Sequence, residues 1–179
     1  YFDYDVDLKK VKKDLLEIAY LFDNQDYRVR LLIESSGKSL LQYFPIAEEG
    51  EVEKRTVGLS KHPVNSSNPF LFHKTTNRVV YEAAKKNAPT LNEVLLWNEK
   101  QELTEFTEGN LVVRWKGKLV TPPIHCGLLG GTFRSKLLEE GLISEKIIPL
   151  SALEEIEEIW FINSVRKWQK VVLESKVKT

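Results

Sequence analysis

The stretch from residue 93 to residue 121 most restricts the fold of this 179-residue chain, because it alternates apolar runs with polar turns at short intervals. Residues 93–97 and 103–106 lie on either side of Asn-Glu-Lys-Gln, and residues 111–115 and 119–121 lie on either side of Lys-Gly-Lys. Short apolar runs bounded by turn residues are typical of β-strands, whereas helices need longer periodic segments. This stretch therefore predicts two consecutive β-hairpins.

Helices are expected between the strands in the rest of the chain. Apolar residues at steps of three and four predict an amphipathic helix over residues 7–22, with Asp5 or Asp7 as its N-cap. Ser151 followed by Glu154 has the pattern of a capping box and predicts a helix over residues 151–158. The other expected elements are a helix from Thr75 or Thr76 to about residue 88, a helix over residues 132–140, and strands over residues 27–33, 40–46, 54–60, 159–162 and 170–173. Helices mixed with strands in no strict βαβ order predict the α+β class.

The composition indicates an ordinary globular protein without a general affinity for polyanions. Lysine plus arginine and aspartate plus glutamate both number 26, so the net charge is zero and neither nucleic acid nor a membrane surface is an expected partner. A single cysteine, no apolar run of about 20 residues and no signal-peptide pattern predict a cytoplasmic location. His62, His73, His125 and Cys126 lack the spacing of metal ligands, so no metal site is expected.

Four short segments contain residues suited to chemistry. They are Lys74 in a polar turn, Glu105 at a strand end, a glycine-rich turn at Gly130-Gly131 that opens a helix, and a small hydroxyl turn at Ser164. This set suits pyridoxal 5'-phosphate, which needs a lysine to hold it covalently, a carboxylate beside its ring nitrogen, and backbone N–H groups for its phosphate. Each segment alone is a weak signal, and the order and spacing of the four favour the cofactor.

At these segments the sequence resembles the fold-type IV pyridoxal-phosphate enzymes, which include aminodeoxychorismate lyases, branched-chain aminotransferases and D-amino acid aminotransferases. It looks most like 4-amino-4-deoxychorismate lyase, in the form that is the lyase part of a fused p-aminobenzoate synthase. The discriminating piece is Lys-Thr-Thr-Asn-Arg at residues 74–78, because such lyases carry Asn and Arg three and four places after the lysine. Branched-chain aminotransferases carry a tyrosine five places after it, where this chain has Val79.

The resemblance implies a role for eight residues. Lys74 would be the catalytic lysine and Glu105 the partner of the ring nitrogen, although Glu102, Glu105 and Glu108 could equally form a solvated edge. Arg166 would bind a substrate carboxylate, or it could face solvent. The expected cofactor-binding residues are Lys74, Glu105, Leu129, Gly131, Thr132, Phe133 and Ser164.

The resemblance also implies a two-lobed fold. Residues 1–121 would be a small lobe carrying the lysine, residues 122–179 would be part of the larger lobe, and Pro122-Pro123 would connect them beside the ligand cleft. The N-terminal part of the first lobe is expected to be missing, since the sequence opens without methionine and lacks the family's upstream phosphate-binding arginine. The resemblance further implies a homodimer, and fusion to or cooperation with a chorismate-aminating synthase component.

Three functions remain open on this basis. The first is a pyridoxal-phosphate lyase that converts 4-amino-4-deoxychorismate to p-aminobenzoate and pyruvate in folate biosynthesis. The second is a branched-chain or D-amino acid aminotransferase, which would use the same residues. The third is a truncated, non-catalytic cofactor-binding domain.

Overall fold

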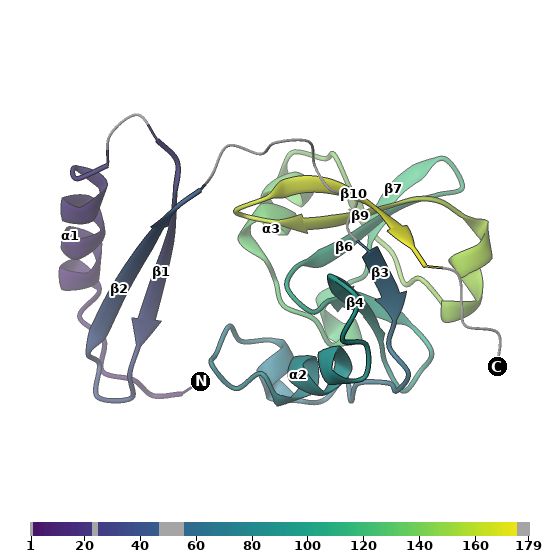
Figure 1. Ribbon diagram of the computed structural model, residues 1–179, viewed down its shortest axis with the longest axis horizontal. Helices are drawn as coiled ribbons and strands as arrows, with labels where there is room; N and C mark the ends of the chain where they lie inside the picture. The colour runs from purple at the N-terminus through teal and green to yellow at the C-terminus, as the bar shows by residue number, and fades with distance from the viewer. Residues whose placement is uncertain (1, 23–24, 47–55, 175–179) are drawn as a thin grey trace. The chain divides into compact units, whose positions relative to one another are not determined.

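Two units make up the chain, Tyr1–Val52 and Glu53–Thr179 (Figure 1). The computed structural model describes residues 2–22, 25–46 and 56–174. The division between units falls well before Pro122, where the sequence suggested a lobe boundary. Strands from both sides of Pro122 pair with one another in the second unit, which therefore continues across these prolines.

The first unit contains a helix, α1 (Leu8–Ala19), and a hairpin of β1 (Tyr27–Ile33) and β2 (Ser39–Pro45). Asp7 caps the helix as expected, because its Oδ1 accepts hydrogen bonds from the second and third N–H groups of the first turn, each at 3.0 Å. The helix ends three residues earlier than the apolar spacing suggested, and the hairpin confirms the strand predictions closely.

The second unit is built on one eight-stranded sheet with the order β5-β4-β3-β10-β9-β6-β7-β8. The first strand of this order, β5, also pairs with β6, the sixth strand. The six strands from β5 to β6 therefore close into a ring. The strands are β3 (Thr56–Leu59), β4 (Glu93–Trp97), β5 (Leu103–Phe106), β6 (Asn110–Trp115), β7 (Lys118–Thr121), β8 (Ser144–Glu145), β9 (Ile156–Asn163) and β10 (Lys167–Leu173). Both predicted hairpins are confirmed, as β4–β5 and β6–β7.

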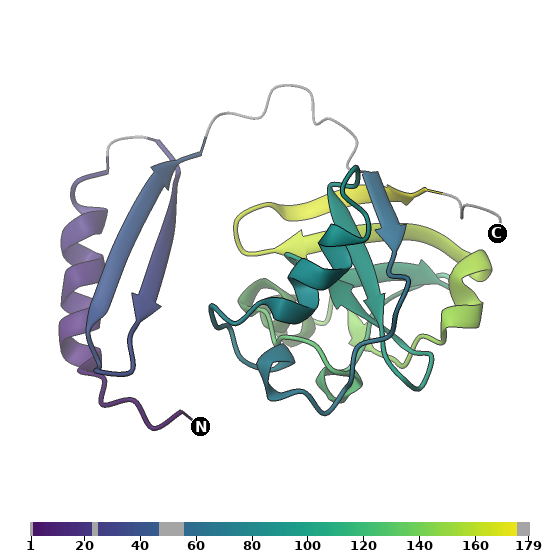
Figure 2. The same cartoon turned by 60° about the horizontal axis from the view of Figure 1, so that its bottom comes forward.

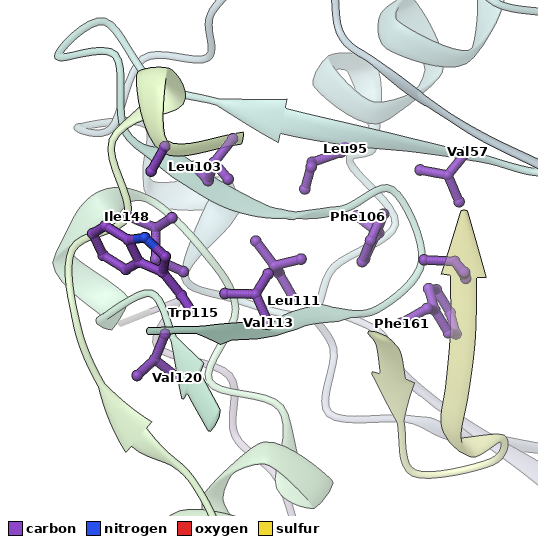
Figure 3. Packing of buried hydrophobic residues seen from close by; sticks show 12 residues of the cluster. Val57, Leu95, Leu103, Phe106, Leu111, Val113, Trp115, Val120, Ile148 and Phe161 are labelled. Carbon is purple, nitrogen blue, oxygen red and sulfur yellow. The ribbon is translucent and has the colours of Figure 1, made fainter. Parts of the chain in front are cut away.

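The main core lies inside this ring of strands (Figure 3). Successive side chains on a strand point to opposite faces, so every second apolar residue enters the interior. On β6, Leu111 and Val113 enter the main core, whereas Val112 between them packs in a separate cluster on the outer face. The buried core residues are Val57, Leu95, Leu103, Phe106, Leu111, Val113, Trp115, Val120, Ile148, Ala152, Phe161 and Val171.

Two helices cover the outer face of the sheet. Tyr81 and Ala84 of α2 (Val79–Lys86) pack against the outward residues of β4, and Figure 2 shows the helix lying across that part of the sheet. Leu137 of α3 (Thr132–Glu139) packs against the outward residues of β6 and β9. The α+β class is confirmed, the segment with Lys74 leads into α2, and the glycine-rich turn opens α3.

The prediction of a helix over residues 151–158 is wrong. Residues Leu150–Glu155 form only a short 3-10 helix, and the chain enters β9 at Ile156. The reason is that β9 pairs with β6 and β10, and this tertiary pairing outweighs the local capping pattern. The predicted strand over residues 159–162 is therefore longer than expected.

The prediction that a threonine caps α2 is also wrong. The N-cap is Arg78, which makes no capping hydrogen bond with its side chain. Thr75 instead accepts the N–H of Asn77 through its hydroxyl and forms a local turn before the helix. The helix consequently begins at Val79, five residues after Lys74.

Candidate functional site

A bulge in β5 sets the position of Glu105. Leu95 pairs with Phe106 and Trp97 pairs with Leu103, so β5 has one residue more than β4 between the two pairs. Leu103 and Phe106 can therefore both enter the core, although they are three residues apart. The carboxylate of Glu105 instead lies under α2, where it meets Tyr81.

Glu105 is buried, with 4% of its surface exposed, and both of its carboxylate oxygens accept hydrogen bonds. The Tyr81 hydroxyl donates to Oε1 at 2.8 Å, and Asn110 Nδ2 donates to Oε2 at 3.1 Å. The alternative of a solvated edge is therefore wrong for Glu105, although it holds for the exposed Glu108. Tyr81 was not among the predicted site residues, because its only signal in the sequence is a tyrosine on the buried face of the helix that follows the lysine motif.

Burial raises the pKa of Glu105 to about 8, because the ionised carboxylate loses its hydration. The Tyr81 hydrogen bond, a hydrogen bond from the Leu129 backbone, and the positive charges of Lys74 and Arg78 act in the opposite direction and lower this pKa. Burial and the neighbouring carboxylate also raise the pKa of Tyr81, so its hydroxyl stays protonated at neutral pH. The buried carboxyl thus lies within electrostatic range of the candidate lysine.

Lys74 and Arg78 lie in the segment that leads into α2. The guanidinium of Arg78 stacks on the ring of Tyr81 at 4.6 Å and donates a hydrogen bond to the carbonyl of Thr107, just after β5. Lys74 is exposed. Its influence on Glu105 is consistent with the two side chains serving one site.

The glycine-rich turn meets the same cluster through Asn110. The side chain of Asn110 bridges Glu105 and the carbonyl of Leu129, to which its Nδ2 donates at 2.7 Å. The next residues are Gly130 and Gly131, and Gly131 is the N-cap of α3. A Cβ on Gly131 would lie 2.1 Å from the Asn110 amide oxygen, so this close approach requires glycine.

The first turn of α3 offers donors for an anion. The N–H groups of Thr132 and Phe133 have no acceptor among the described residues, and N–H groups at a helix start point outward along the positive end of the helix dipole. Thr132 is exposed and Gly131 carries no side chain, so the backbone is accessible there. The ring of Phe133 packs edge-on against Trp168.

Replacing Gly131 with alanine is expected to lower the free energy of unfolding by about 1–3 kcal/mol, because the new methyl group would overlap a buried, hydrogen-bonded amide. Urea denaturation followed by tryptophan fluorescence would measure this change. Gly130→Ala is the matched control, since its methyl group would meet only the end of the Ile124 side chain, at 3.2 Å. Equal loss in both variants would contradict the packing of Asn110 on Gly131.

Ser164 and Arg166 lie in the exposed turn between β9 and β10. Asn163 organises this turn, because its side-chain oxygen accepts the N–H groups of Val165 and Arg166. Its amide group also donates to the carbonyl of Glu108, in the turn between β5 and β6. The turn predicted for phosphate and substrate binding is thereby tied to the end of β5 that carries Glu105.

The described residues contain no cluster of histidine, cysteine, aspartate or glutamate suited to a metal ion. No helix in the described part of the chain is long and apolar enough to cross a membrane.

Cys126 is buried, and burial raises the pKa of its thiol to about 12. A protonated, buried thiol is a poor nucleophile, so the chemistry of the site depends on other residues.

The chain is similar in sequence to a known family. The family model described as amino-transferase class IV matches residues 1–173. A Schizosaccharomyces pombe protein named "Putative aminodeoxychorismate lyase" is 35% identical over 159 residues, which are 84% of this chain and 68% of that protein.

Solved structures show the same fold. A Mesorhizobium loti structure named "Putative amino-acid aminotransferase" is 28% identical with a TM-score of 0.85, and the match covers 96% of this chain and 84% of that one. The 4-amino-4-deoxychorismate lyase of Pseudomonas aeruginosa is 16% identical with a TM-score of 0.77, over 96% of this chain and 72% of that one. The fold-type IV prediction is confirmed, and this chain belongs to the class IV amino-transferase family.

Proposed function

We propose that this chain carries the active site of a pyridoxal-phosphate lyase that converts 4-amino-4-deoxychorismate to p-aminobenzoate and pyruvate. The observation that carries the proposal is the hydrogen-bonded link from Glu105 through Asn110 to the turn that opens α3. It joins a buried carboxyl, suited to a ring nitrogen, to a helix start suited to a phosphate.

The residues present fit this cofactor. An ionised carboxylate offers about four acceptor positions. Tyr81 and Asn110 use two of them, which leaves room for a ring N–H. A protonated ring nitrogen would also supply the opposite charge that favours the ionised form of Glu105. The backbone N–H groups at the start of α3 would hold the phosphate.

Lys74 would perform the proton transfers. When bound, pyridoxal phosphate withdraws electrons and makes the proton on the amine-bearing carbon of the substrate acidic. The Lys74 amine removes that proton and returns a proton to the departing enolpyruvyl group. The C–O bond to this group breaks and the substrate ring becomes aromatic, so the reaction is downhill and needs mainly correct orientation.

Two observations bear on the choice between lyase and aminotransferase. The lyase is supported by the 35% identity to the Schizosaccharomyces pombe protein and by the Lys-Thr-Thr-Asn-Arg segment. The aminotransferase is the second candidate, because the Mesorhizobium loti structure has a TM-score of 0.85 at 28% identity. A homodimer and a chorismate-aminating partner belong to the lyase proposal.

Product analysis of a single-substrate reaction tests the proposal. The protein is incubated with pyridoxal phosphate and 4-amino-4-deoxychorismate, without any keto acid. We expect equal amounts of pyruvate and p-aminobenzoate over many turnovers. An aminotransferase would stop after about one turnover per site until a keto acid is added, because its cofactor keeps the amino group. Absence of any cofactor-dependent product would favour the non-catalytic domain.

A further inference from the structure

The hydroxyl of Tyr81 donates a hydrogen bond to Oε1 of Glu105 at 2.8 Å. The contact is buried, and it joins a helix residue to a strand residue that is 24 positions away in the sequence. Asn110 holds the other oxygen from β6. The plane of the carboxyl group is therefore fixed from two different elements.

Tyr81 is itself held on both sides. The outward residues of β4, Val94 and Leu96, pack with it, and Arg78 stacks on its ring. The guanidinium of Arg78 is anchored in turn by the carbonyl of Thr107. The hydroxyl thus has a defined direction, and it remains a donor at neutral pH because burial raises its pKa.

We propose that Tyr81 is a positioning residue, whose hydroxyl holds Oε1 of Glu105 so that one acceptor position of the carboxylate stays available to the ring nitrogen of a pyridine cofactor. The inference rests on the proposed function. Tyr81 does not move a proton in the reaction, and it acts only through Glu105. Tyr81 lies in α2, seven residues after Lys74, so the segment that carries the lysine leads directly into the helix that holds Glu105.

Tyr81→Phe tests this role, because it keeps the ring under Arg78 and removes only the hydroxyl. In protein without cofactor, NMR of carbon-13-labelled glutamate should show the pKa of Glu105 rising above about 8, since a donor that stabilises the carboxylate is lost. With cofactor, kcat should fall about ten- to hundredfold, while KM changes little. Thr121→Val is the control, since it removes another buried hydroxyl, which bonds the carbonyl of Leu111.

An unchanged titration of Glu105 in Tyr81→Phe would overturn the inference, whatever the enzyme does. A second test does not depend on the folding of Tyr81→Phe. Incorporating 3-fluorotyrosine in place of tyrosine makes the hydroxyl at position 81 a stronger hydrogen-bond donor, which should lower the pKa of Glu105. No shift would again overturn the inference. If Glu105 responds as expected but no cofactor becomes bound to Lys74, the proposed function fails and the positioning role for a pyridine cofactor fails with it.

Discussion

Replacing Lys74 with alanine is expected to lower turnover by at least about a thousandfold, because one change removes both the covalent link to the cofactor and the group that moves protons. Borohydride reduction of the parent protein with pyridoxal phosphate should attach the cofactor to the peptide that contains Lys74. The same treatment of the variant should leave that peptide unlabelled. Steady-state kinetics and peptide mass spectrometry measure the two effects.

Lys86→Ala provides the matched control. Lys86 is exposed in the last turn of α2, the helix that Lys74 precedes, and it takes no part in the Glu105 cluster. This variant should keep both turnover and labelling. Attachment of the cofactor to a lysine other than Lys74 in the parent protein would show that the site has been placed wrongly.

The strands of the second unit could be predicted because they follow local rules. The hairpins of residues 93–121 carry polar turns at short intervals, and the helix α3 stops next to Gly141, whose φ of +68° suits glycine. Closure of the sheet could not be predicted. It depends on the pairing of Glu105 with Asn110, which concerns two residues and leaves no pattern in the sequence.

In the candidate site, too, local features could be predicted and contacts between distant residues could not. Glu105, Gly131 and the start of α3 could be proposed from the sequence, because a carboxylate at a strand end and a glycine-rich helix start are local features. The choice of Glu105 among three nearby glutamates came from the resemblance to the fold-type IV enzymes. The bulge in β5 and the contact of Tyr81 with Glu105 depend on how α2 packs on the sheet. Packing of this kind joins residues far apart in the chain, so neither feature could be read from the sequence alone.

Replacing Glu105 with glutamine is expected to lower kcat about a hundred- to a thousandfold while the affinity for the cofactor falls much less. Glutamine keeps the size and an acceptor oxygen for Tyr81, but it lacks the charge that stabilises a protonated ring nitrogen. That charge matters most when electrons flow into the ring, so the loss belongs to the transition state. Spectroscopic titration with pyridoxal phosphate and steady-state kinetics separate the two quantities.

Protein stability provides an independent check on the same variant. The pKa of Glu105 is raised by folding, so the stability that its proton contributes is fully present below about pH 4.5 and is lost as the pH rises to about 8. Without cofactor, the variant should therefore become more stable relative to the parent across this range. Glu108→Gln, which alters an exposed carboxylate three residues away, should change neither this dependence nor kcat. Parent-like turnover in Glu105→Gln would remove this carboxyl from the mechanism, even if the pH dependence of unfolding confirms its burial.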